Sequence, residues 1–106
     1  MNSWSKFHAK KTTIDGITFA SKKEAKRYQE LKYLERINEI EDLKMQVPFV
    51  LIDKSNYGRV IKYVADFTYY EMGMYVVEDV KGVKTPVYKL KKRMLAERYG
   101  IVIRET

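Results

Sequence analysis

Residues 59–81 read RVIKYVADFTYYEMGMYVVEDVK, and this stretch decides the fold. It contains two runs rich in β-branched and aromatic residues, separated by Met72-Gly73, a pair typical of a tight turn. We therefore expect two neighbouring antiparallel strands. Each run carries an acidic residue in an otherwise apolar setting, Asp66 in the first and Asp79 in the second.

Turn and capping signals extend this pattern toward the N-terminus. Asp15-Gly16 is a favoured two-residue turn and predicts a hairpin over 12–19. Ser21 followed by Glu24 fits a capping box, which predicts a helix that runs to about Ile37.

Further elements are expected on both sides of the central stretch. Residues 43–52 predict a strand, in which Pro48 indicates either an edge position or a bulge. Thr85-Pro86 predicts the start of a helix that continues to about Tyr99. A short strand over 101–105 would follow.

The predicted order is hairpin, helix, three strands, helix and strand. This order indicates an α/β domain with a mixed β-sheet flanked by two helices, because the last strand arrives through a helical crossover. The length of 106 residues suits one domain over 1–106, in which 1–11 are expected to form a flexible basic arm.

Composition narrows the function classes. The chain has no cysteine, which excludes disulfides and thiolate metal sites. No apolar run approaches the roughly 20 residues of a membrane span, so we expect a cytoplasmic protein with no membrane partner. The net charge of +7 favours a polyanionic partner such as nucleic acid.

The basic residues are concentrated between 81 and 98, where only Glu97 opposes them. The alternative interpretation is a solvated helix face. On the helix, Lys91 lies among the apolar Val87, Leu90, Met94 and Leu95, where it either extends to water or reaches a phosphate. The candidate DNA-binding residues are Lys84, Lys89, Lys91, Lys92 and Arg93.

The acids suggest a metal centre. Side-chain alternation places Asp79 and Lys81 on one face of their strand and Glu78 on the other, unless a bulge makes Glu78 the ligand. Antiparallel pairing can bring Asp66 beside Asp79, and two carboxylates suit Mg²⁺, with Mn²⁺ as a substitute. The alternative is an Asp66–Lys81 salt bridge with Asp79 in solvent.

Asp66 followed by Asp79-Val80-Lys81-Gly82 resembles the D…(D/E)-x-K signature of the PD-(D/E)XK nuclease superfamily, although Ala65 stands where the signature has proline. That superfamily has the restriction-endonuclease-like fold, with the element order predicted here from residue 21 onward. Several segments are similar to a family of small phage and prophage proteins that is placed among these nucleases: KFHAKKT, DGITFASKKEAKRY, LKMQVPF, KYVADF and VVEDVKG.

The resemblance implies roles for particular residues. Asp66, Asp79, Lys81 and Glu24 would be catalytic, and the metal would be held by Asp66, Asp79, Glu24 and the backbone carbonyl of Val80. Glu24 is equally explained as the capping-box residue. Gln46 would lie near the site, or else be an exposed polar residue on a half-buried strand.

The resemblance further implies a Mg²⁺-dependent DNA endonuclease in phage recombination or DNA processing. Its substrate would be branched DNA such as Holliday junctions, not a small molecule. Symmetric cutting of two strands would require a homodimer. The alternatives are a nicking or restriction-like duplex endonuclease and a basic nucleic-acid-binding module without catalysis.

Overall fold

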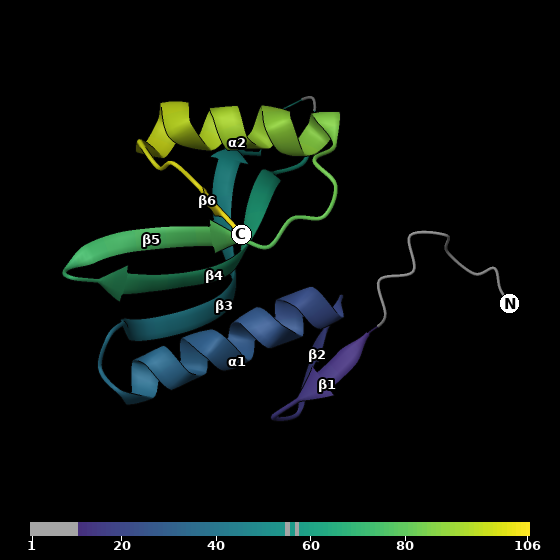
Figure 1. Cartoon of the computed structure of the whole chain (residues 1–106). Helices are drawn as coiled ribbons and strands as arrows, with labels where there is room; N and C mark the ends of the chain where they lie inside the picture. Colours follow the sequence, from purple (N-terminus) through teal and green to yellow (C-terminus); the bar gives the residue numbers. More distant parts are fainter. Residues whose placement is uncertain (1–10, 55, 57) are drawn as a thin grey trace, which may run out of the picture.

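A computed structural model describes residues 11–54, 56 and 58–106; residues 1–10 of the predicted basic arm lie outside the described part. The elements follow the predicted order, with two helices and two sheets in the described residues (Figure 1). They are β1 (Thr12–Ile14), β2 (Ile17–Phe19), α1 (Lys22–Arg36), β3 (Glu41–Ile52), β4 (Ile61–Glu71), β5 (Met74–Asp79), α2 (Pro86–Tyr99) and β6 (Arg104–Glu105).

The larger sheet has the strand order β3-β4-β5-β6. β3, β4 and β5 pair antiparallel, and β6 joins β5 in parallel after the crossover through α2, so the predicted mixed α/β fold is confirmed. Pro48 lies in β3, an edge strand, as its missing N–H requires. Figure 1 shows α1 and α2 on opposite sides of the sheet, with the β3–β4 hairpin reaching from one helix to the other.

The ends of the elements have the local chemistry that the sequence predicts. Asp15 and Gly16 turn the β1–β2 hairpin with φ values of 54° and 75°. The Ser21 hydroxyl accepts a hydrogen bond from the Glu24 N–H at 3.1 Å and caps α1. Thr85 caps α2 in the same way, and Gly100 ends that helix.

The hydrophobic core has two parts, one against each helix. The part against α1 consists of Phe19, Ala25, Tyr28, Leu31, Ile40, Phe67, Tyr69 and Val76. The part against α2 consists of Leu51, Tyr63, Ala65, Val77, Tyr88, Leu95 and Ile103. The two parts lie on opposite sides of the sheet.

The β3–β4 hairpin changes face at Asp66. Ala65 belongs to the core part against α2, whereas Phe67 belongs to the part against α1. Residues two apart in a flat strand face the same side, so this change marks a sharp twist. The register places Gln46 opposite Asp66, and Gln46 has a left-handed φ of 53°.

Two predictions about the C-terminal half differ from the structure. β6 covers only Arg104–Glu105, not 101–105. Of the apolar residues predicted on the inward face of α2, Val87 and Leu90 are 61% and 59% exposed, whereas Leu95 is buried and Met94 packs against the core, as predicted. Tyr88, which was not in the predicted set, is also buried against the sheet. The apolar positions of α2 cover more of its circumference than one packing face, so spacing identified that face only in part.

Candidate functional site

The two acids of the motif, Asp66 and Asp79, lie side by side at the twist of the sheet. The register that pairs Phe67 with Glu78 places Asp66 opposite Asp79 at the end of β5. The Val80 N–H donates to Asp66 Oδ2 at 2.9 Å and ties the chain after β5 to this carboxylate. Asp79 is only 1% exposed, so the alternative with Asp79 in solvent is wrong.

Burial and the neighbouring Asp79 carboxylate raise the pKa values of Asp66 and Glu24. Burial, followed by the hydrogen bond with Asp79, raises the pKa of Asp66 to about 8. Burial and then repulsion from Asp79 raise the pKa of Glu24, against an opposing effect of Lys81. Acids from α1, β4 and β5 thus meet in one electrostatic cluster that a cation would stabilise.

Lys81 is held over this cluster by two neighbours. Its Nζ lies 3.5 Å from Asp79 Oδ2 and 4.4 Å from the centroid of the Tyr88 ring. The Tyr63 hydroxyl donates to the same Asp79 oxygen, and burial raises the pKa of Tyr63, which keeps the hydroxyl protonated. Tyr63 also belongs to the core part against α2, and strand propensity alone gives no signal for its contact with Asp79.

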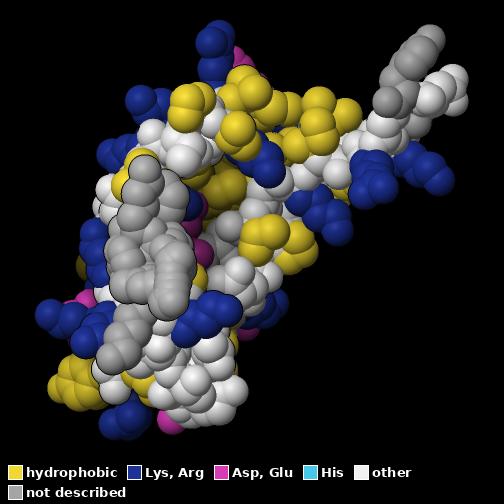
Figure 2. Space-filling model, turned by 90° about the vertical axis from the view of Figure 1, so that its right-hand side faces the viewer, with side chains coloured by type: hydrophobic (Ala, Val, Ile, Leu, Met, Phe, Trp, Pro, Cys, Tyr) yellow, Lys and Arg dark blue, Asp and Glu magenta, His cyan; other side chains and the backbone are white. Residues whose placement is uncertain are grey.

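Gln46 is exposed on β3, as one of the two interpretations expects, and it also contacts the acid cluster. Its Nε2 donates to Glu24 Oε2 at 3.3 Å. The two side chains and Asp66 line a hollow of about 380 Å³ between the β1–β2 hairpin, α1 and β3, here called the acidic hollow. Figure 2 shows acidic side chains on the floor of a depression whose rim carries hydrophobic and basic side chains.

Glu24 therefore has two structural roles. Its backbone N–H donates to the Ser21 hydroxyl, which is the Ser21 half of the predicted capping box. Its carboxylate accepts from Gln46 and interacts with Asp79. The carboxylate is thus directed toward the acid cluster, and its role as a metal ligand stays a prediction.

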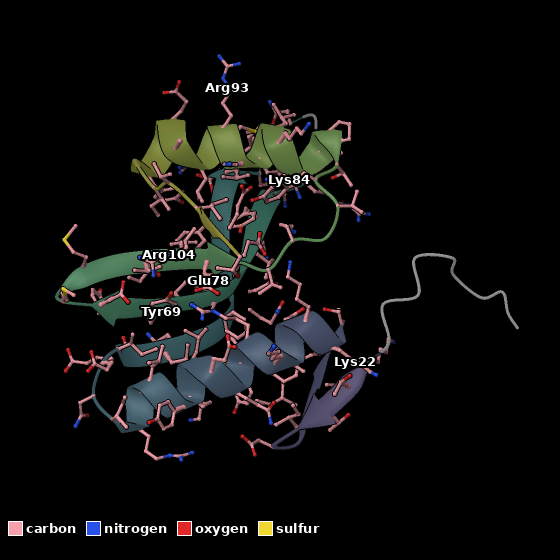
Figure 3. All side chains as sticks on the ribbon, in the orientation of Figure 1. Lys22, Tyr69, Glu78, Lys84, Arg93 and Arg104 are labelled. Atoms are coloured by element: carbon pink, nitrogen blue, oxygen red, sulfur yellow. The ribbon has the colours of Figure 1, made fainter. Side chains whose placement is uncertain are left out.

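Glu78 points to the opposite face, as strand alternation predicts. It is completely buried, and Arg27 binds it through two nitrogens, Nε at 2.6 Å and Nη2 at 3.0 Å. Tyr69 and Thr106 also donate to it (Figure 3). Burial alone would raise the Glu78 pKa, but these donors outweigh burial and lower it. Glu78 is thus part of a buried ion pair, not of the acid cluster.

The predicted basic set divides into groups. Lys84 and Lys92 pair with Glu105 at 3.1 and 3.2 Å, so an acid from outside the basic stretch neutralises part of it. Arg93 points from α2 away from the sheet, and Lys89 is exposed. Lys91 lies beside Lys81, Lys62 and Val64 around a second hollow.

The donor set suits a hard cation but does not form a complete cage. In the described residues, no three Asp, Glu, His or Cys side chains are gathered closely enough to hold a metal by themselves. Mg²⁺ is commonly bound by one or two carboxylates, with water and substrate phosphate completing its shell. Asp66 and Asp79, together with the predicted Val80 carbonyl, offer oxygen ligands of this kind.

The fold and the site define a small α/β domain with an acid–lysine centre at a twist of its sheet. The chain belongs to a family described as a protein of unknown function (DUF1064), whose model matches residues 4–105. No curated protein matches the chain, and no solved structure does. Within the described residues, neither helix is long and apolar enough to cross a membrane.

Proposed function

We propose that this protein is a Mg²⁺-dependent DNA endonuclease whose centre consists of Asp66, Asp79 and Lys81. The observation that carries the proposal is the convergence of buried Asp79 and half-buried Asp66 with a lysine whose Nζ lies 3.5 Å from Asp79. A buried structural acid is normally paired by a cation or by several donors, as Glu78 is. Asp66 instead accepts from the Val80 N–H and lies against a second acid, Asp79.

The residues of the chain would act as follows. Asp66 and Asp79 would hold the metal, with Glu24 reaching it directly or through water. Bound Mg²⁺ would offset charge on the phosphate and activate water. Lys81 would stabilise negative charge that develops on the phosphate oxygens. Tyr63 orients Asp79 through its hydroxyl, and the Tyr88 ring keeps Lys81 near that carboxylate.

DNA as substrate is supported by the basic surface beside this centre. Lys62, Lys81 and Lys91 surround one hollow, and exposed Lys89 lies on the same helix as Lys91. Arg93 points away from the sheet and does not belong to this surface. The proposal also includes a preference for branched DNA and a homodimer that cuts two strands. These two features rest only on the resemblance of the Asp66…Asp79-Val80-Lys81 motif to the PD-(D/E)XK nucleases.

The test is a cleavage assay with end-labelled four-way junction and linear duplex, in Mg²⁺ or in EDTA. Asp79→Asn removes the proposed ligand, and Asp42→Asn is the matched control because Asp42 is 56% exposed and remote from the cluster. We expect Mg²⁺-dependent cutting by the wild type and by Asp42→Asn, with at least about a 100-fold loss in Asp79→Asn.

Two outcomes would overturn the proposal. One is cleavage by Asp79→Asn at the wild-type rate. The other is DNA binding by the wild type without cleavage of any substrate in Mg²⁺ or Mn²⁺, which would favour the non-catalytic binding module. Equal cutting of junction and duplex would retain the nuclease and remove only the preference for branched DNA.

A further inference from the structure

A second hollow lies on the α2 side of the acids. Its volume is about 280 Å³. We call it the lysine hollow because three of its lining residues are lysines: it is lined by Lys62, Tyr63, Val64, Lys81, Thr85, Val87, Tyr88 and Lys91. Lys81 and Tyr63 both line it and contact Asp79, so an occupant would lie one side chain away from the acid cluster.

The charge of the lysine hollow is opposite to that of the acidic hollow. Its lining contains no acid, whereas Glu24 and Asp66 line the other one. Lys81 is paired with Asp79, but neither Lys62 nor Lys91 forms a salt bridge within the part of the chain that the structure describes. These two ammonium groups are available to an anion, whereas the acidic hollow would repel a phosphate unless a bound cation offset its charge.

The lysine hollow also has an apolar wall. Val64 and Val87 line it and are 45% and 61% exposed, although both are β-branched hydrophobic residues. The Tyr88 ring forms part of the same lining. A ligand that contacts both the lysines and the apolar side chains needs an anionic group and a flat apolar group a short distance apart. A nucleotide has both, in its phosphate and its base.

We propose that the lysine hollow binds the nucleotide that adjoins the phosphate at the acid cluster. Lys62 and Lys91 contact the flanking phosphate, and the base or sugar lies against Val64 and Val87. The strand thus approaches the centre from the α2 side. This inference deepens the proposed nuclease function, from which it takes only the position of the reacting phosphate.

The test is a titration followed by valine-methyl NMR, with 5′-phosphorylated trithymidylate as the probe and EDTA present. The expected result is that the Val64 and Val87 resonances move, whereas those of Val102 do not. Val102 is an apt control because it is 81% exposed and lines a different hollow with Met74.

Charge variants test the role of the lysines. Lys62→Gln with Lys91→Gln is expected to weaken binding of a longer single strand. The same pair of changes should lower the salt slope of that binding by about 1.4, because each lysine that no longer neutralises a phosphate removes about 0.7. Lys32→Gln with Lys44→Gln has the same charge change and is expected to retain the wild-type slope, because those lysines lie outside the hollow and pair with Glu35 and Asp42.

Three outcomes would overturn the inference: equal movement of Val102, no movement of Val64 and Val87, or wild-type binding by the Lys62/Lys91 variant. If inorganic phosphate moves the two valines as far as the trinucleotide does, the hollow is an anion site only, and the nucleotide is excluded. The assay requires neither metal nor cleavage. A failure of the nuclease proposal would therefore leave these results unchanged, and cleavage by the wild type would not rescue a failed titration.

Discussion

Substitution of the adjacent acids Glu78 and Asp79 is expected to change the free energy of unfolding by very different amounts. Glu78→Gln retains the size of the side chain but removes the charge that Arg27 neutralises through two nitrogens at 2.6 and 3.0 Å. Breaking a buried ion pair typically costs about 3–5 kcal/mol. Arg27 keeps 24% of its side chain exposed and can recover some hydration, so we expect a loss near the lower limit, about 3 kcal/mol.

Glu30→Gln is the matched control, because Glu30 pairs with the same arginine at 3.3 Å but is 49% exposed. An exposed pair of this kind contributes about 0–1 kcal/mol. Asp79→Asn removes one of two neighbouring carboxylates, which relieves repulsion while weakening the interaction with Lys81. We expect its stability to remain within about 1 kcal/mol of the wild type.

Urea denaturation measures these differences as shifts of the midpoint at constant m-value. The expected order of stability places Glu30→Gln and Asp79→Asn near the wild type and Glu78→Gln well below them. The reasoning would be refuted if Glu78→Gln were no less stable than Glu30→Gln. It would also be refuted if Asp79→Asn lost as much stability as Glu78→Gln, since Asp79 would then be a structural residue.

Two further predictions concern Gln46 and Glu105. Gln46→Gly should raise the free energy of unfolding by up to about 1 kcal/mol, because glycine adopts the φ of 53° without strain. Gln29→Gly in the exposed middle of α1 should lower it by about 1 kcal/mol, because glycine is unfavourable inside a helix. Equal losses of stability for the two variants in thermal denaturation would contradict this reasoning. Hydrogen bonds from Tyr88 and Lys84 lower the pKa of Glu105 from 4.5 to about 2. The contribution of Glu105 to stability is therefore present above pH 4.5 and is lost as the pH falls toward 2. The difference in stability between the wild type and Glu105→Gln should shrink over this range, and a constant difference would contradict the lowered pKa of Glu105.

Local chemistry determined the parts of the fold that the sequence predicted well. The turn at Asp15-Gly16, the caps at Ser21 and Thr85, and the end of α2 at Gly100 each depend on a few neighbouring residues. Strand alternation likewise separated Glu78 from Asp79 correctly.

Interactions between distant elements account for what the sequence did not reveal. Glu105 reaches Lys84 and Lys92 only because β6 pairs in parallel with β5. Counting charges along a segment of the sequence does not reveal this pairing. Tyr63 lies three residues before Asp66, and simple alternation would place the two on opposite faces. The twist at Asp66 allows the Tyr63 hydroxyl to reach Asp79.

The most direct test of a metal centre in this protein is calorimetric titration with Mn²⁺ in the absence of DNA. If Asp66 and Asp79 form a divalent metal centre, Asp66→Asn and Asp79→Asn should each weaken Mn²⁺ binding by at least about tenfold, whereas Asp42→Asn should bind as the wild type does. Equal Mn²⁺ affinity in all four proteins, or no binding by the wild type at millimolar metal, would contradict the assignment of these acids as a metal centre.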